Sequence, residues 1–166
     1  MARAFCFGDN VDTDQIIPGN AATSTDPAEL AKHCLEGADP TFADRVQPGD
    51  VIVAGENFGS GSSREHAALA IVGTGVDAVV AESFARIFFR NGINVGLPLL
   101  TIDGVTDEIE DGDTVTVSPS DGFIENETRG VRLSSVSYPD FITELIDAGG
   151  LIPYGRQLDE PGEPPE

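Results

Sequence analysis

The segment from Gly55 to Leu69 has the sequence GENFGSGSSREHAAL and places small residues, one arginine and one histidine directly ahead of a helix-forming run. Glycine lets a backbone approach a ligand closely, and the free N–H groups at a helix N-terminus attract anions. Arg64 can bind a carboxylate through two parallel hydrogen bonds. The segment therefore predicts a pocket for a carboxylate, although Arg64 could instead pair with one of the 29 acidic residues of the chain, and composition alone does not decide between the two.

Two serines in this segment suggest proton transfer. An unassisted serine hydroxyl is a poor base, but a helix N-terminus and an adjacent guanidinium both stabilise an alkoxide. Ser62 or Ser63 could then remove a carbon-bound proton next to a carboxylate. His66 follows them by three and four residues on a helix that we expect to begin at Ser62 or Ser63, so it shares their face. We expect His66 to make a structural hydrogen bond that supports the loop.

Other motifs with glycine-rich loops do not fit the segment. A phosphate-binding P-loop needs a lysine after Gly61, where Ser62 stands. Gly59 and Gly61 match the first two glycines of the dinucleotide-binding motif G-x-G-x-x-G, but Arg64 occupies the position of the third glycine. The Gly-x-Ser-x-Gly elbow of serine hydrolases is not matched either.

The cysteines and histidines are too few and too scattered to predict a metal site. Cys6 and Cys34 form no Cys-x-x-Cys pair, which is typical of small buried side chains in a reducing compartment. His33 and His66 are the only histidines, so a histidine-based metal site is improbable. We expect this chain to hold no metal.

Alternating strand-like and helical runs must position the glycine-serine segment, and they indicate an α/β fold. The expected strands cover residues 3–8, 50–55, 77–83 and 97–102, and the expected helices cover 28–36, 62 or 63 to about 72, 84–94 and 138–148. Residues 9–26 are expected as a long functional loop. After Asp103, turn-rich segments with period-two alternation over 114–117 predict antiparallel strands of a meander or barrel wall.

The length and charge restrict the possible domains and partners. The 166 residues suit one domain over residues 1–157, followed by a disordered acidic tail over 158–166. A formal net charge of −20 argues against a nucleic-acid partner. The acidic residues are spread along the chain and Lys32 is the one lysine. This composition is typical of a protein surface that stays soluble in molar salt. Since no signal peptide or apolar span is evident, we expect a cytoplasmic protein with no membrane contact.

Three separated motifs carry a resemblance to a known family. They are FGDNVDTDQIIPG from residue 7, GENFGSGSSREHAALA from residue 55 and ESFARIFFRNGINVGLPLL from residue 82. Over residues 3–155 the chain resembles the small subunits of 3-isopropylmalate dehydratase, the stand-alone counterparts of the swivelling domain of aconitase. The resemblance implies a swivelling β/β/α domain with a mixed, partly parallel sheet or barrel flanked by helices.

The resemblance also implies a reaction and a partner. A separate large subunit would carry a 4Fe–4S cluster on its own cysteines, and this chain would bind no cofactor. Together they would interconvert 2-isopropylmalate and 3-isopropylmalate through 2-isopropylmaleate, with the cluster iron as Lewis acid on the leaving hydroxyl. By similarity Ser62 is the base, Ser63 and Arg64 contact the substrate carboxylate, Asp14 lines the pocket, and Gly59, Gly61 and His66 support the loop.

The segment Ala21–Ser24 departs from the family pattern and affects the expected substrate. Related enzymes for substrates with an extra carboxylate carry an arginine here, whereas this chain has Thr23, which we expect to contact the substrate. The missing charge-assisted contact is worth roughly 1.5–3 kcal/mol, which disfavours citrate-like and homoaconitate-like substrates. Citramalate or another alkylmalate, homoaconitate, and a non-catalytic carboxylate-binding module on the same fold remain alternatives to isopropylmalate.

Overall fold

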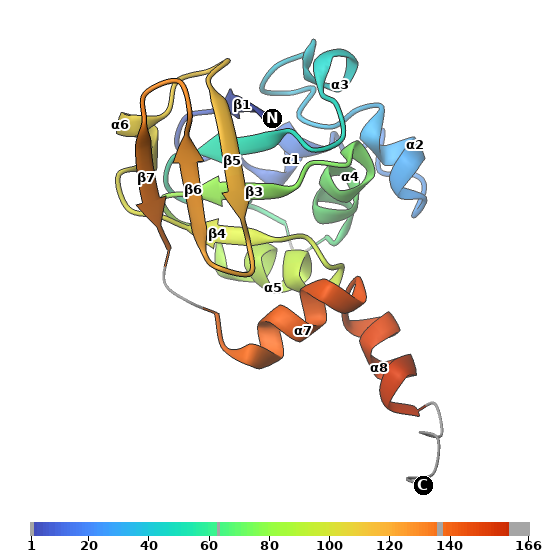
Figure 1. Ribbon diagram of the computed structural model, residues 1–166. Coiled ribbons are helices and arrows are strands. Elements are labelled where there is room, and N and C mark those ends of the chain that lie inside the picture. The colour runs from blue at the N-terminus through green and yellow to red at the C-terminus, as the bar shows by residue number, and fades with distance from the viewer. Residues whose placement is uncertain (1, 63, 136–137, 160–166) are drawn as a thin grey trace, which may run out of the picture.

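The protein is built on one seven-stranded sheet with a parallel half and an antiparallel half (Figure 1). The computed structural model describes residues 2–62, 64–135 and 138–159. The strand order is β4-β3-β2-β1-β5-β6-β7, in which β1 to β4 are mutually parallel and β5 to β7 form an antiparallel meander joined to β1. The strands are β1 (Ala2–Cys6), β2 (Val51–Ala54), β3 (Ala78–Ala81), β4 (Leu99–Thr101), β5 (Thr114–Ser118), β6 (Phe123–Asn126) and β7 (Val131–Ser134). The mixed, partly parallel sheet expected from the sequence is confirmed.

Eight helices accompany the sheet in the described part of the chain. They are α1 (Thr13–Ile16), α2 (Pro27–Ala31), α3 (Phe42–Arg45), α4 (His66–Thr74), α5 (Arg86–Asn94), α6 (Val105–Glu108), α7 (Asp140–Ala148) and α8 (Leu151–Asp159). Helices α2 and α4 make the most extensive helix–helix contact, and α5 packs against both α4 and α7. In Figure 1, α2 and α4 lie on one side of the molecule, and α7 and α8 lie below α5.

Two hydrophobic cores cover the two faces of the parallel strands. On β2, Ile52 belongs to the core beneath the helices, whereas its neighbours Val51 and Val53 belong to the core beneath the antiparallel half. Val115 of β5 and Ile124 of β6 complete this second core, so the sheet curls over its own face. Every residue of β2 and β3 is buried, and continuous apolar sequences such as theirs are typical of strands that are covered on both faces.

Long-range hydrogen bonds move two helix boundaries away from the expected ones. The expected helix over 28–36 ends at Ala31, because Leu35 adopts a left-handed backbone and donates its N–H to Ile16, 2.7 Å away. The helix expected to begin at Ser62 or Ser63 begins at His66, because the Ser62 N–H donates to the Thr13 side chain and holds the preceding loop against α1.

Four helices were not expected from the sequence. Helix α1 lies inside the expected loop over 9–26, α3 and α6 have only four residues each, and α8 follows the helix that was expected to close the chain. The helix α8 also extends into the first residues of the segment 158–166, the expected tail, and the rest of this segment lies outside the described residues.

The carboxylate of Asp113 joins the turn before β5 to β6. It accepts hydrogen bonds from the Glu110 N–H at 2.9 Å and from the Asn126 side-chain amide at 2.8 Å, and that amide also donates to the Glu108 carbonyl. These donors favour the ionised form, so the Glu110 N–H first, then Asn126 and the nearby Arg129, lower the pKa of Asp113.

We therefore predict a pH-dependent loss of stability in Asp113→Asn. A lowered pKa stabilises the folded state above the ordinary aspartate pKa of about 3.9, and this contribution disappears as the pH falls through the lowered value. Thermal unfolding at neutral pH should show that the free energy of unfolding of Asp113→Asn is lower than that of wild type by about 1–2 kcal/mol. This difference between variant and wild type should decrease in acid. The exposed Asp107 has no side-chain hydrogen bond or ion pair among the described residues, so Asp107→Asn is the charge-matched control. If the free energy of unfolding of Asp113→Asn differs from wild type by the same amount at neutral and acidic pH, the ionised Asp113 carboxylate is not the cause.

Candidate active site

Backbone hydrogen bonds continue the pairing of β1 with β2 beyond the ends of both strands. They run from N–H to carbonyl between Phe7 and Val53, Gly55 and Gly8, Asn10 and Glu56, Gly59 and Val11, and Thr13 and Ser60, with donor–acceptor distances of 2.7–3.2 Å. We call this set of bonds between residues 7–13 and 53–60 the seam. The seam holds the glycine-serine loop against α1. In the sequence these two segments are far apart and show no sign of contact.

The other side of the same loop is bonded to the segment that follows β3. Phe58 donates its N–H to Ser83 and accepts from Ala85, at 3.1 and 2.9 Å. The Phe58 ring is fully buried and meets the rings of Phe84 and Phe88 edge to face. Because it is paired on both sides, the loop is held in a fixed position at the carboxyl edge of the parallel strands, the edge where α/β proteins bind ligands.

Hydrogen bonds hold Ser62 through both its backbone and its side chain. Its N–H donates to Thr13 Oγ1 at 3.1 Å, and its Oγ accepts from the Arg64 N–H at 3.2 Å. The Thr13 side chain is itself buried, with 5 % of the residue exposed. A backbone donor on Ser62 Oγ stabilises negative charge there. This donor belongs to the loop and not to the end of α4, which begins four residues after Ser62.

Gly59 and Gly61 are required by their neighbours. Both have left-handed backbones, with φ of +86° and +107°. A Cβ on Gly59 would lie 2.1 Å from the Phe88 ring, and one on Gly61 would lie 3.1 Å from Thr13 Oγ1. The glycines therefore let the loop fit between α1 and α5, a packing role that the sequence pattern does not distinguish from close approach to a ligand.

A small pocket unites three of the residues that the sequence singled out. Asp14, Ser62 and Arg64 line it together with Ala22, which belongs to the segment Ala21–Ser24 that was expected to affect the substrate, and with three residues that sequence reasoning missed: Thr13, Ile17 and Ala67. The motif DTDQ placed Thr13 next to Asp14, but nothing in the sequence indicated that Thr13 would contact Ser62. The pocket volume is about 10 Å³, which holds about one water molecule. The described chain alone therefore does not enclose a diacid.

One predicted contact, Thr23, lies away from this pocket, and another, Ser63, cannot be placed. Thr23 is exposed and does not line this pocket, whereas its neighbour Ala22 does. Ser63 lies outside the described residues.

The guanidinium of Arg64 is available to an anion. Arg64 is exposed, and it forms no ion pair with an acidic side chain of the described residues. Its Nη1 lies 3.8 Å from where a Cβ of Gly19 would stand, so its side chain extends beside the segment after α1. The alternative that Arg64 serves a surface ion pair therefore has no support in the described geometry.

His66 does not show the structural hydrogen bond expected of it. It is the first residue of α4, and its Nδ1 is buried without a hydrogen-bond partner in the described part of the chain. Its position at the end of the loop is as expected, but the contact that would support the loop is not observed.

The two cysteines are poorly suited to metal binding. Burial, and then the charge of Asp111, raise the pKa of Cys6 to about 12, and full burial raises the pKa of Cys34. Both thiols are therefore protonated at neutral pH. Residues 2–62, 64–135 and 138–159 contain no group of three or more histidine, cysteine, aspartate or glutamate side chains arranged to hold a metal ion. None of the described helices is both long enough and apolar enough to cross a lipid bilayer.

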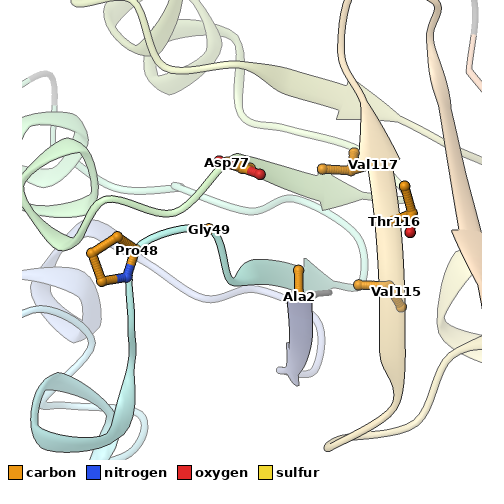
Figure 2. A pocket seen from close by; sticks show the side chains of 7 residues that line it. All are labelled: Ala2, Pro48, Gly49, Asp77, Val115, Thr116 and Val117. Atoms are coloured by element: carbon orange, nitrogen blue, oxygen red, sulfur yellow. The ribbon is translucent and has the colours of Figure 1, made fainter.

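A larger hollow of about 400 Å³ lies at the other end of the parallel strands, where β5 diverges from β1 (Figure 2). Pro48 and Gly49 ahead of β2 form one wall, and Thr116 and Val117 of β5 form another. Among the described residues that line it, Asp77 is the only titratable side chain, and the Thr116 hydroxyl is the other polar side-chain group. With no basic side chain to bind a carboxylate, these two groups do not form the predicted anion pocket, so this hollow is not the candidate site.

Comparisons with known proteins agree with the fold and with the motifs. A family model described as the aconitase C-terminal domain matches residues 38–104. The small subunit 1 of 3-isopropylmalate dehydratase from Methanopyrus kandleri is 54% identical over 150 residues, covering 90% of this chain and 88% of that one. The isopropylmalate/citramalate isomerase small subunit from Methanocaldococcus jannaschii is 51% identical, covering 92% of this chain and 90% of that one.

A solved structure gives the same assignment. The crystal structure of 3-isopropylmalate dehydratase from Methanocaldococcus jannaschii superposes with a TM-score of 0.89 and 48% identity, covering 95% of this chain and 93% of that one. The match spans both halves of the sheet and the segment that carries Asp14, Ser62 and Arg64. The chain therefore belongs to the family of 3-isopropylmalate dehydratase small subunits, which share the swivelling domain of aconitase.

Proposed function

We propose that this chain is the small subunit of a two-subunit hydro-lyase that interconverts 2-isopropylmalate and 3-isopropylmalate through 2-isopropylmaleate, in leucine biosynthesis. The observation that carries the proposal is the pocket in which Ser62, Arg64 and Asp14 meet, although they come from two segments about 50 residues apart. A positioned hydroxyl beside a guanidinium that pairs with no acidic side chain of residues 2–62, 64–135 and 138–159 suits the removal of a proton next to a carboxylate.

In this proposal Ser62 and Arg64 have distinct roles. The Arg64 guanidinium binds a substrate carboxylate, and Ser63 adds a contact to the same group. Ser62, as the alkoxide, takes the carbon-bound proton and becomes a hydroxyl, while the electron pair of the C–H bond forms the alkene and the C–O bond to the leaving hydroxyl breaks. A cluster on the large subunit would supply the Lewis acid that accepts the leaving hydroxide. The Arg64 N–H, which already donates to Ser62 Oγ, stabilises the alkoxide. In the reverse sense Ser62 returns the proton to the alkene.

We infer that the 4Fe–4S cluster of this family belongs to a large subunit. Such a cluster takes cysteine thiolates as ligands. The sequence holds two cysteines, and burial favours the protonated form of both, so the residues of this chain do not fit the cluster. The small volume of the pocket supports the same division, because a substrate is enclosed only when another surface covers Ser62 and Arg64.

The alkyl group of the substrate is proposed to face Ile17 and Ala22. Both line the pocket and neither offers a polar group, while no basic side chain at position 23 is available for a third carboxylate. This arrangement favours an alkylmalate over a tricarboxylate. Citramalate is the second candidate substrate, because a relative with 51% identity is named isopropylmalate/citramalate isomerase small subunit.

We also propose that the protein works in a cytoplasm of high salt concentration, as its net charge of −20 suggests. Repulsion among exposed carboxylates destabilises the folded state at low ionic strength, and salt screens it. The midpoint of thermal unfolding should therefore rise by several degrees between low salt and molar KCl. A midpoint that falls as KCl rises would contradict this proposal.

The role of Ser62 is tested by Ser62→Ala in the enzyme reconstituted with its large subunit. We predict that kcat for 3-isopropylmalate falls by about 10²–10⁴, the usual contribution of a general base, with circular dichroism and unfolding midpoint unchanged. Ser60→Ala in the same loop is the matched control and should keep wild-type kcat, because only the backbone of Ser60 takes part in the seam. Unchanged turnover in Ser62→Ala would exclude Ser62 as the base.

The role of Thr13 is tested by comparing Thr13→Val with Thr13→Ser. Valine removes the hydroxyl that accepts the Ser62 N–H, whereas serine keeps it. We predict that Thr13→Val lowers kcat roughly tenfold, the equivalent of one lost hydrogen bond, with KM little changed, and that Thr13→Ser restores most of the rate. Equal rates for the two variants would show that the hydroxyl does not position Ser62.

A further inference from the structure

Helix α1 carries two residues of the pocket but is too short to hold its own position. Its residues, Thr13–Ile16, form about one helical turn, and a single turn is not stable in isolation. From this turn Thr13 accepts the Ser62 N–H, and Asp14 lines the pocket beside it. The placement of both side chains therefore depends on the contacts that hold the two ends of α1.

A capping box holds the first end of α1. The Asp12 carboxylate accepts the Gln15 N–H at 2.8 Å, and the Gln15 side-chain oxygen accepts the Asp12 N–H at 3.0 Å. In such a box each side chain satisfies a backbone N–H that the start of a helix leaves without a helical partner. The box therefore fixes the backbone on both sides of Thr13, which donates its own N–H to the Ser60 carbonyl at 2.8 Å.

Residues 35–37 hold the other end of α1. Leu35 donates its N–H to the Ile16 carbonyl at 2.7 Å, and Gly37 donates its N–H to the Gln15 carbonyl at 3.1 Å. A Cβ on Gly37 would lie 2.7 Å from the Gln15 Cα, so glycine is needed for this close approach. Gln15 thus takes part in both contacts, through its side chain at one end of the turn and through its carbonyl at the other.

The side chain of Gln15 does not belong to the pocket itself. The residues of this segment that line the pocket are its neighbours Thr13, Asp14 and Ile17. Gln15 instead lines a separate hollow of about 500 Å³, together with Gly37. A substrate bound at Ser62 therefore does not touch Gln15, and any effect of Gln15 on the reaction passes through α1.

We propose that Gln15 is a positioning residue for the base of the proposed reaction. Through the capping box it holds the Thr13 hydroxyl where that hydroxyl accepts the Ser62 N–H. This bond keeps the loop in the position from which Ser62 Oγ reaches the substrate. The inference rests on the proposed function, because it takes Ser62 as the base. The hydrogen bonds do not depend on that function, and their loss can be measured without substrate.

Kinetics of the enzyme reconstituted with its large subunit test this role. Gln15→Met removes the acceptor oxygen at nearly constant size, whereas Gln15→Glu keeps it, since glutamate also forms capping boxes. Gln15→Met should lower kcat for 3-isopropylmalate about fivefold with KM little changed, and Gln15→Glu should restore most of the rate. Added to Thr13→Val, Gln15→Met should cause little further loss, because both changes act on the same bond. Gln47→Met, at an exposed glutamine ahead of β2, is the matched control and should keep the wild-type kcat.

Hydrogen exchange of the full chain alone tests the same inference without a measurement of activity. In Gln15→Met the Ser62 N–H should exchange about tenfold faster than in wild type, because its bond to Thr13 opens more often. The Val79 N–H of the buried strand β3 should keep its rate, because the fold as a whole is retained. Gly37→Ala should reproduce this pattern by pushing on α1, whereas Gly155→Ala adds the same group in open space and should leave both rates unchanged.

These measurements separate a failure of the inference from a failure of the proposed function. Unchanged exchange of the Ser62 N–H in Gln15→Met, or an equal acceleration at Val79, would overturn the positioning role. A Gln15→Glu enzyme as slow as Gln15→Met would overturn it as well. A reconstituted wild type that does not act on isopropylmalate would refute the proposed function, and faster exchange of the Ser62 N–H in Gln15→Met would then still support the placement of Ser62 by Gln15.

Discussion

The seam between residues 7–13 and 53–60 is the interaction on which the candidate site depends. Its hydrogen bonds extend the parallel pairing of β1 and β2 into two loops that would otherwise carry unpaired backbone groups. Thr13 ends the seam and accepts the N–H of Ser62. A serine on a glycine-rich loop is thereby fixed by the sheet itself, and catalysis needs such fixed placement of its reacting groups.

The two cores make the seam possible. Because β2 and β3 are buried on both faces and the middle of β1 is buried too, these strands are held firmly, and the loops that leave them start from fixed points. The helices cover one face and the curled antiparallel half covers the other. The site at the carboxyl edge therefore rests on rigid elements, and under the proposed function the large subunit would supply the surface that closes over the substrate.

Much of the architecture could be predicted from local sequence patterns. The strands β2 and β3, which have continuous apolar sequences, and the alternation in β5 depend on patterns of a few residues and appear as expected. The start of α4 and the end of α2 could not be predicted, because hydrogen bonds to α1, some 20 to 50 residues away, set both boundaries. For the same reason the sequence indicated Asp14, Ser62 and Arg64 but not Thr13. Thr13 acts by accepting the Ser62 N–H, a contact between residues 49 positions apart. His66 illustrates a different limit, because the expected hydrogen bond of its side chain is not observed among the described residues.

The central claim is that Ser62 and Arg64, on the loop that the seam holds in place, bind and deprotonate a diacid. The most direct measurement is a crystal structure of the chain with its large subunit and a bound alkylmalate. We predict one substrate carboxylate on the Arg64 guanidinium and the acidic C–H within reach of Ser62 Oγ, with the bond from the Ser62 N–H to Thr13 intact. A diacid bound away from Arg64, or a loop in which Ser62 has left Thr13 and points away from the substrate, would contradict the account.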